Sequence, residues 1–272
     1  MNPGNIVWVF YFTMQKKEII SHIVNWLKEY SDKSGTNGFV IGISGGIDSA
    51  LTSTLCALTN KPVVILKMPI RQHQAEVDRA LEHMVWLKKN FTNVSSHVQD
   101  LTPIFEKIED DFPKQVQDFL TMANTRSRLR MMTLYAYASH YRMLVAGTGN
   151  KIEDFGVGFY TKYGDGGVDI SPIADLMKSE VYALAKELGV VNSILEARPT
   201  DGLFADGRSD EDQIGATYDE LEWAMTALEK NENETTFTAR QKEVIKIYKE
   251  RHAANKHKMD AIPVCLIPKN LF

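Results

Sequence analysis

FVIGISGGIDSALTSTL, residues 39–55, predicts a strand, a glycine turn and a helix in immediate succession. The strand, Phe39–Ile43, is rich in apolar and β-branched residues, and good helix formers follow Ser49. Gly45 and Gly46 let the backbone turn tightly and direct N–H groups at one point. The positive end of the following helix lies at the same point. This stretch therefore predicts a phosphate group bound where the helix starts.

Asp48 is the unusual member of this turn. A carboxylate beside a polyphosphate repels it unless a divalent cation lies between them. The chain contains neither GxxxxGK[ST] nor GxGxxG, which disfavours kinase-type loops and ordinary dinucleotide folds. The turn thus predicts a nucleotide pyrophosphate group and Mg²⁺ bridged to Asp48. The alternative is a tight strand-to-helix turn that Asp48 caps.

Composition limits the classes of partner. The net charge of −4 argues against sequence-independent nucleic-acid binding, which needs a basic face. The longest apolar run, Ile6–Phe12, is far shorter than the roughly 20 residues of a membrane span. The two cysteines, Cys56 and Cys265, form no CxxC pair, and Cys56 is predicted to be a buried core residue. We expect a cytoplasmic protein that binds neither nucleic acid nor membranes.

Strands and helices are predicted to alternate along the chain. The predicted strands are 39–43, 62–68, 93–98 and 143–146, and the predicted helices are 15–30, 48–59, 72–89, 123–141, 178–188, 210–229 and 238–257. Residues 100–120 are predicted mostly helical, with breaks near Pro103 and Pro113. Alternation of this kind predicts an α/β fold, a doubly wound, mostly parallel Rossmann-like sheet flanked by helices.

The domain prediction has three parts. Residues 1–13 are an N-terminal extension, 14–258 a single catalytic domain, and 259–272 an extended C-terminal tail. Within the domain, the segment 155–173 is too long and too rich in glycine for a simple connection. Long loops of this kind are often functional.

The SGGxDS motif at Ser44–Ser49 resembles that of the N-type ATP pyrophosphatases, whose fold is adenine nucleotide alpha hydrolase-like. GTGNKIEDFGVGFYTKYGDGGVDISPI, residues 147–173, resembles the signature block of the NAD⁺ synthetase family. The segments 124–131 (NTRSRLRM) and 198–222, with the pair at 257–258, add to this resemblance, which spans about Phe39 to Lys258. The family is thus suggested by most of the chain.

This resemblance implies a ligase that forms a C–N bond. Its substrates would be deamido-NAD⁺ (nicotinic acid adenine dinucleotide), ATP and ammonia, with Mg²⁺ as cofactor. Some family members carry a further N-terminal glutaminase domain, whereas only 38 residues precede Phe39 here. The ammonia-dependent form is therefore expected, and the resemblance also implies a homodimer.

Site residues follow from the resemblance by position. The implied ATP-binding residues are Gly42, Ile43, Ser44, Gly45, Gly46, Ile47, Asp48, Ser49, Thr148, Lys178 and Thr200. The implied deamido-NAD⁺-binding residues are Arg128, Lys162, Asp169, His257 and Lys258. Asp48 and Glu153 would hold Mg²⁺. Arg126 and Arg130 are expected to be surface or dimer salt-bridge residues.

Three residues are expected to carry the chemistry. Asp48 would hold the metal, and Lys178 would neutralise charge as adenylate forms and pyrophosphate leaves. Ammonium must lose a proton before it can attack, and Asp165 is a candidate to accept it. The alternative for Asp165 is a turn residue between glycines.

Other functions are open at this stage. The nearest is another enzyme of the pyrophosphatase fold, such as a GMP synthetase module or a tRNA thiolation or lysidine enzyme. The tRNA enzymes need a basic surface or extra binding domains, and neither is evident. A non-catalytic nucleotide-binding regulator would need neither Glu153 nor Lys178. A structural or interaction protein leaves the glycine-rich segment unexplained.

Overall fold

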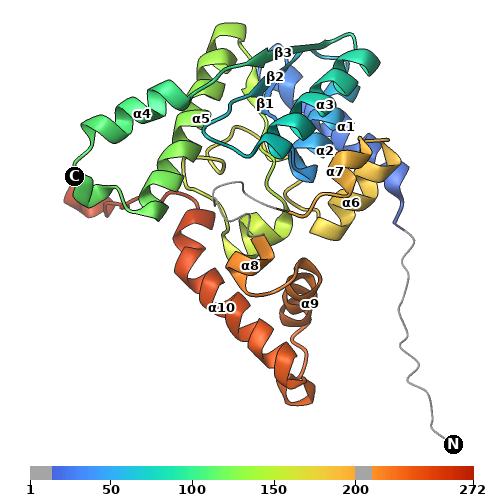
Figure 1. Cartoon of the computed structure of the whole chain (residues 1–272). Coiled ribbons are helices and arrows are strands. Elements are labelled where there is room, and N and C mark those ends of the chain that lie inside the picture. Colours follow the sequence, from blue (N-terminus) through green and yellow to red (C-terminus); the bar gives the residue numbers. More distant parts are fainter. Residues whose placement is uncertain (1–13, 200–209) are drawn as a thin grey trace, which may run out of the picture.

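A parallel β-sheet forms the centre of the protein (Figure 1). The computed structural model describes residues 14–199 and 210–272. Within this part of the chain the strands are β1 (Phe39–Gly42), β2 (Val63–Lys67), β3 (Val94–Val98) and β4 (Leu144–Val145), in the order β3-β2-β1-β4. Every pairing is parallel, so the predicted doubly wound α/β fold is confirmed.

Helices surround this sheet. The α-helices are α1 (Lys16–Lys33), α2 (Ile47–Leu58), α3 (Gln74–Asn90), α4 (Thr102–Asp111), α5 (Phe119–Tyr141), α6 (Lys178–Glu187), α7 (Asn192–Leu195), α8 (Asp210–Ile214), α9 (Tyr218–Glu229) and α10 (Ala239–Met259). The short helical segments are η1 (Lys114–Val116), the π-helical η2 (Ile152–Val157), η3 (Glu234–Thr236) and η4 (Lys269–Leu271). No helix of the described residues is long and apolar enough to cross a membrane.

Both faces of the sheet are covered, because alternate strand residues point to opposite sides. Phe39 and Ile41 pack in a core with α1, α2, α3 and α6. Val40 and Leu66 pack in a second core with α4 and α5. Every residue of β2 is buried, as the absence of polar alternation before Lys67 predicts. Cys56 is also buried and unpaired in the first core, as expected.

The carboxyl ends of the parallel strands meet at one edge of the sheet. Gly42 of β1 lies opposite Leu66 of β2, and the Ile43 N–H donates to the Leu66 carbonyl over 2.8 Å. Beyond β4, Ala146 forms a parallel bridge to Ile170, which returns from the glycine-rich segment. Loops that leave several strands therefore gather at this edge, the usual place for a ligand in open α/β sheets.

A third layer stands beside this edge. Helices α9 and α10 pack against each other and against η2, with Leu221 and Val244 in a separate core (Figure 1). Ile152 and Val157, at the two ends of η2, are buried in this core. The helical pair thus fixes η2, which carries Glu153, above the end of the sheet.

Most helix boundaries lie within three residues of prediction, and three larger differences have a clear physical cause. Helix α5 begins at Phe119 because the Asp118 carboxylate accepts the Thr121 N–H over 3.0 Å and caps it. The helix predicted over 210–229 is two helices, since Gly215 has φ of +91° and Thr217 caps α9. Pro103 lies in the first turn of α4, where its missing N–H costs nothing, so it starts a helix that it was expected to break.

The apolar pattern of 72–89 predicts an inward face made of Ala75, Ala80, Leu81, Met84, Val85 and Leu87, and this is wrong in part. Ala80, Met84 and Leu87 are buried as predicted, whereas Ala75 is exposed. Leu81 and Val85 are 37% and 68% exposed. These two residues fit helical periodicity. However, the face of α3 that packs against the core is narrower than the face that carries apolar residues.

Gly45 is the backbone constraint on which the glycine turn depends. Its φ is +97°, and a Cβ built there would lie 2.6 Å from the Glu76 carbonyl oxygen of α3. Gly46 differs, because a Cβ there would meet nothing closer than the Ser44 Oγ, at 3.3 Å. The turn needs glycine at the first position for both conformation and space.

We therefore expect Gly45→Ala to lower the free energy of unfolding by about 1–3 kcal/mol, because it adds strain and a backbone clash. Gly46→Ala is the matched control and should change it by less than about 1 kcal/mol. Urea unfolding followed by circular dichroism measures both. Equal losses in the two variants would contradict this account of the turn.

Candidate functional site

A cleft of about 960 Å³ lies at the carboxyl end of the sheet. It is bounded by the glycine turn, by α5 and by the ends of η2 and α10. The predicted site residues that line it are Gly42, Ile43, Ser44, Gly45, Gly46, Ile47, Asp48, Ser49, Arg128, Thr148, Glu153, Lys162, Asp165, Lys178, His257 and Lys258. Segments far apart in sequence therefore converge on one cavity.

Two cations of the cleft wall hold the carbonyl groups of the glycine turn. Lys67, at the end of β2, donates to the Ser44 carbonyl over 3.2 Å. Arg79 of α3 donates to the Gly45 carbonyl over 3.4 Å. In a trans peptide the N–H points opposite to its carbonyl, so the N–H groups of Gly45 and Gly46 point away from these cations. The Gly46 N–H donates to Ser44 Oγ over 3.1 Å, and the Ser44 N–H donates to Ser49 Oγ over 3.2 Å. An anion on the turn would replace these serine hydroxyl groups as the acceptor.

Lys178 joins the two predicted metal ligands in the centre of the cleft. Its Nζ lies 2.6 Å from Asp48 Oδ2 and 2.9 Å from Glu153 Oε1. The Lys178 side chain is only 5% exposed, and those of Asp48 and Glu153 are 17% and 16% exposed. Helix α2, η2 and the first residue of α6 supply one member each. One ammonium group thus bridges two carboxylates that the sequence separates by 105 residues.

Asn150 and Tyr218 complete this centre. The Asn150 amide donates to Asp48 Oδ1 over 3.0 Å, and the Tyr218 hydroxyl donates to Glu153 Oε1 over 2.6 Å. The Tyr218 ring centroid lies 4.7 Å from Lys178 Nζ, within reach of a cation–π contact. Sequence reasoning missed both residues, although Asn150 lies inside the quoted block 147–173.

Burial and charge act against each other in this centre. Burial raises the pKa of Asp48, and the attraction of Lys178 opposes it. Burial would also raise the pKa of Glu153, but Lys178 and the Tyr218 hydrogen bond outweigh it, so the pKa is lowered. Burial would lower the pKa of Lys178, but Asp48 and Glu153 hold it above its ordinary value. Lys178 is therefore a firmly charged ammonium.

The two carboxylates fit a Mg²⁺ ion, because they already converge on a single cation, the Lys178 ammonium. The described residues contain no group of three or more His, Cys, Asp or Glu side chains placed to hold a metal. Mg²⁺ is commonly held by one or two carboxylates together with water and substrate phosphates. Asp48 and Glu153 would thus hold the ion only as part of a complex with a phosphate ligand.

The far end of the cleft carries three of the predicted substrate-binding cations. Arg128 donates through Nε to the Lys162 carbonyl over 3.2 Å. Lys162 Nζ donates to the His257 carbonyl over 2.7 Å. Lys258 Nζ donates to the Gly158 carbonyl and, over 2.7 Å, to that of Tyr160. These bonds tie the glycine-rich segment to α5 and to the end of α10, and they gather positive charge there.

Asp165 lies in the same part of the cleft. Its Oδ1 accepts the Ser127 hydroxyl over 2.6 Å and the Thr161 N–H over 3.0 Å. The Ser127 hydroxyl also accepts the Asp165 N–H over 2.9 Å. Both bonds that Asp165 accepts go to one oxygen, and the residue is exposed to the cleft. The carboxylate is therefore positioned and open to a small cation.

Three predicted positions have a different outcome. Asp169 is absent from the cleft lining, since its carboxylate accepts the Val145 N–H over 2.8 Å and the Tyr135 hydroxyl over 2.9 Å. Thr200 lies outside the described residues. The expectation that Arg130 is a surface residue is wrong: it lines the cleft and donates to the Met68 carbonyl over 3.1 Å. Helix periodicity could not place it, because the cleft wall is built from β2 and α5 together.

Lys67 is the clearest functional candidate that sequence reasoning passed over. It is 1% exposed, and burial followed by the nearby Arg130 charge lowers its pKa to about 8. Its signal in the sequence is that it ends an otherwise apolar buried strand, two positions before Pro69. A buried lysine at the carboxyl end of a parallel strand is a candidate ligand contact.

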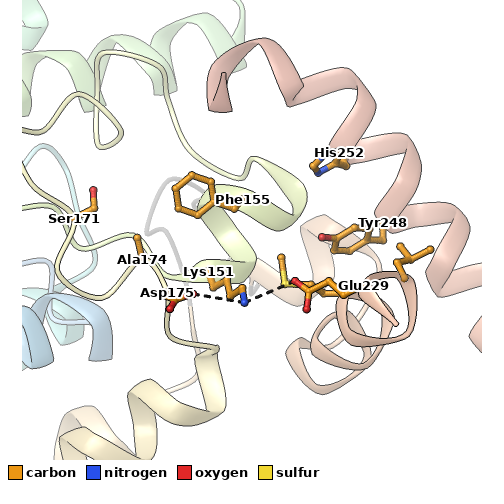
Figure 2. Close-up of a pocket in the computed structure, with 10 residues that line it drawn as sticks. Lys151, Phe155, Ser171, Ala174, Asp175, Glu229, Tyr248 and His252 are labelled. Atoms are coloured by element: carbon orange, nitrogen blue, oxygen red, sulfur yellow. Dashed lines mark ion pairs between the residues drawn. The ribbon is translucent and has the colours of Figure 1, made fainter. Parts of the chain in front are cut away.

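A second hollow, of about 470 Å³, lies beside η2, between α9 and α10 (Figure 2). Phe155 and Tyr248 contribute to its wall, and Lys151 forms ion pairs with Asp175 and Glu229 across it. None of the predicted site residues lines this hollow. The predicted chemistry therefore belongs to the large cleft.

Asp154 follows Glu153 in η2, and its carboxylate lies close to Gly149. A Cβ built on Gly149 would lie 2.1 Å from Asp154 Oδ2. Burial, and then the charges of Glu153, Asp165 and Asp48, raise the pKa of Asp154 to about 8. The site thus concentrates acidic groups around η2, and their mutual repulsion adds to burial in keeping the Asp154 carboxyl protonated at neutral pH.

The comparisons with known proteins point to one family. A family described as NAD synthase matches residues 19–261. An NH₃-dependent NAD⁺ synthetase of Alkaliphilus metalliredigens is 39% identical over 213 residues, which cover 75% of this chain and 83% of that protein.

Two solved structures share the fold. An NMN synthetase from Francisella tularensis has a TM-score of 0.81 and 32% identity, with coverage of 93% of this chain and 98% of its own. An NH₃-dependent NAD synthetase from Campylobacter jejuni has a TM-score of 0.75 and 28% identity, covering 93% of this chain and 100% of its own. The alignments with both structures thus extend over nearly the whole chain.

Asp154→Asn should change how stability depends on pH. A carboxyl group whose pKa is raised on folding contributes most stability below its unfolded pKa and loses it as pH rises toward the folded value. The wild type should therefore lose stability between pH 5 and pH 8 relative to the variant, by about 3–4 kcal/mol. Urea unfolding across this range measures the difference. Asp175→Asn, which alters an exposed carboxylate, is the control, and parallel curves for all three proteins would contradict the prediction.

Proposed function

The chain belongs to the NAD synthase family, whose members are ligases, and we propose that it is ammonia-dependent and amidates deamido-NAD⁺ to NAD⁺. The match of the family over residues 19–261 carries this proposal. The cleft supports it, because one cavity holds the glycine turn, a carboxylate pair and a cluster of cations. These are the parts that an ATP-dependent amidation of an anionic dinucleotide needs.

The proposed reaction has two steps. The nicotinate carboxylate attacks the α-phosphorus of ATP, and the bond between the α-phosphorus and the bridging oxygen to the β-phosphate breaks. Pyrophosphate is released, and the dinucleotide is now adenylated. Ammonia then attacks the activated carbonyl carbon and loses a proton, and AMP leaves as the amide forms. The protein provides positioning and charge neutralisation, since the cleft presents charged and hydrogen-bonding groups to both substrates.

We assign the ATP phosphates to the glycine turn and to Lys178, with Thr148 and Lys67 on the adjoining wall. Mg²⁺ held by Asp48 and Glu153 would neutralise phosphate charge and polarise the α-phosphoryl group. Thr200, outside the described residues, keeps its proposed ATP contact from the family resemblance alone.

The dinucleotide is assigned to the far end of the cleft. Arg128, Lys162 and Lys258 supply positive charge for its pyrophosphate, and His257 adjoins them. For Asp169, the hydrogen bonds to Val145 and Tyr135 favour a structural role that supports β4, so we no longer assign it to the substrate.

A homodimer is also proposed. The C-terminal tail exposes Val264, Leu266 and Phe272 by 75%, 85% and 92%. Helix α5 exposes Leu120 by 67%. Apolar groups exposed to this extent commonly mark an interface. Sedimentation velocity tests the assembly, and a sedimenting mass of one chain at micromolar concentration would contradict it. The domain limits at 13 and 258 and a cytoplasmic location likewise stay proposals.

A second candidate function is amidation of the corresponding mononucleotide. It is favoured by one observation, the 32% identity and TM-score of 0.81 to the Francisella tularensis NMN synthetase. We prefer the dinucleotide because three cations line the far end of the cleft, where a second phosphate would contact them. The mononucleotide offers these cations a single phosphate.

The function is tested by incubating the protein with ATP, Mg²⁺, ammonium and either deamido-NAD⁺ or the mononucleotide. With deamido-NAD⁺ we expect NAD⁺ and AMP in equal amounts. The kcat/KM for the dinucleotide should be at least about tenfold higher than that for the mononucleotide. Asp48→Ala and Glu153→Ala should each lower NAD⁺ formation by about 100-fold or more, since each removes a metal ligand. Asp175→Ala, an exposed carboxylate outside the cleft, should retain activity.

Three outcomes would count against the proposal. Absence of NAD⁺ in every buffer excludes the activity, and preference for the mononucleotide selects the second candidate. Glutamine replacing ammonium equally well in pure protein contradicts ammonia dependence.

Asp165→Asn tests the proposed proton acceptor. We expect the KM for ammonium at pH 7 to rise about tenfold or more, because the variant neither attracts the cation nor accepts its proton. Exchange of labelled pyrophosphate into ATP, which reports only the first step, should stay within about twofold. Equal losses in both measurements would indicate that Asp165 only supports the loop through Ser127 and Thr161.

A further inference from the structure

Lys178 occupies the point where a cation shared by Asp48 and Glu153 must lie. Its Nζ contacts one oxygen of each carboxylate, at 2.6 and 2.9 Å. A metal ion held by both carboxylates would compete with the Lys178 ammonium for the same negative charge. Two cations that share one pair of carboxylates would also repel each other. Binding of a metal would therefore favour movement of Lys178 away from the pair.

The surroundings favour movement of the lysine over movement of the carboxylates. Asp48 is held by Asn150, and Glu153 by Tyr218, each through a further hydrogen bond. Glu153 also lies in η2, which is anchored in the core of α9 and α10. Lys178 has four rotatable side-chain bonds, and it lines the same cleft as the glycine turn. A triphosphate on that turn would offer the ammonium new anionic partners.

The charge balance supports the same movement. With both carboxylates ionised, Asp48, Glu153 and Lys178 sum to −1. A triphosphate would be repelled by this net charge. One Mg²⁺ added to the three groups brings the sum to +1, which attracts the phosphates. The lysine then neutralises phosphate oxygens, where charge accumulates as pyrophosphate leaves.

We propose that the Lys178 ammonium is a resident counter-ion that a divalent cation displaces from Asp48 and Glu153, so that the same side chain moves onto the phosphates of ATP. This assignment rests on the proposed function for the identity of the phosphate ligand. It gives Lys178 two positions in the reaction cycle.

The first prediction concerns metal affinity without nucleotide. Mn²⁺, a paramagnetic substitute for Mg²⁺, should bind Lys178→Met at least about tenfold more tightly than the wild type, since the competing positive charge is gone. The free ion is counted by its electron paramagnetic resonance signal. The double variant Lys178→Met with Asp48→Asn should lose this gain in Mn²⁺ affinity. Lys67→Met removes another buried lysine of the cleft, one that does not contact the carboxylates, and it should show no gain in Mn²⁺ affinity.

Two further measurements separate an effect on metal binding from a failure of the Lys178 variants to fold. Lys178→Gln preserves most of the side-chain length and two N–H donors, and it should gain Mn²⁺ affinity as Lys178→Met does. Mn²⁺ should also raise the unfolding temperature of both variants and leave that of the wild type nearly unchanged. If a variant is unfolded without metal, recovery of its circular dichroism on addition of Mn²⁺ supports the proposal, and failure to recover counts against it.

Two results would overturn the inference. One is folded Lys178 variants that bind Mn²⁺ no more tightly than the wild type, and the other is an equal gain in Lys67→Met. Failure of the proposed function is a separate result, because it is seen in the wild type as a lack of NAD⁺ formation. The metal measurement uses neither ATP nor the dinucleotide, so either idea can fail while the other stands.

Discussion

The buried ion pairs of Lys178 with Asp48 and Glu153 are the interaction on which the site depends. They join α2, η2 and α6, which are separated by up to 130 residues along the chain. Removing these three groups from water costs several kcal/mol for each charge, and their attraction offsets this cost only while the set is complete. Such a centre adds little net stability, so its value lies in holding opposite charges where a charged substrate reacts.

The rest of the cleft is arranged around that centre by the parallel sheet. Strand ends at one edge of the sheet place the glycine turn and Lys67 in the cleft wall. The glycine-rich segment, bonded to α5 and α10, adds Arg128 and Lys258 to the lining of the same cleft. The cleft therefore has one end suited to a triphosphate and another suited to a second anion. The reacting groups would meet between them, next to Lys178.

Local pattern predicted much of this arrangement. The strand at Phe39, the fully buried β2 and the turn after β1 follow from residue types and short-range periodicity, and all are confirmed. Periodicity failed where burial depends on the partner element. Val85 has the spacing of a core residue yet lies in solvent, and Arg130, expected to be a surface or dimer salt-bridge residue, lies in the cleft wall. Neither outcome can be obtained from one helix considered alone.

The sequence by itself determined the parallel α/β fold, the glycine turn and, through the block at 147–173, the family. It did so because steric limits at glycine and the alternation of apolar strands with amphipathic helices are local properties. Only the tertiary structure decided that one ammonium bridges Asp48 and Glu153, that Tyr218 and Asn150 support them, and that Asp169 turns to Val145. Those contacts join segments that lie far apart in the chain, and their distances exist only once the core has brought the segments together.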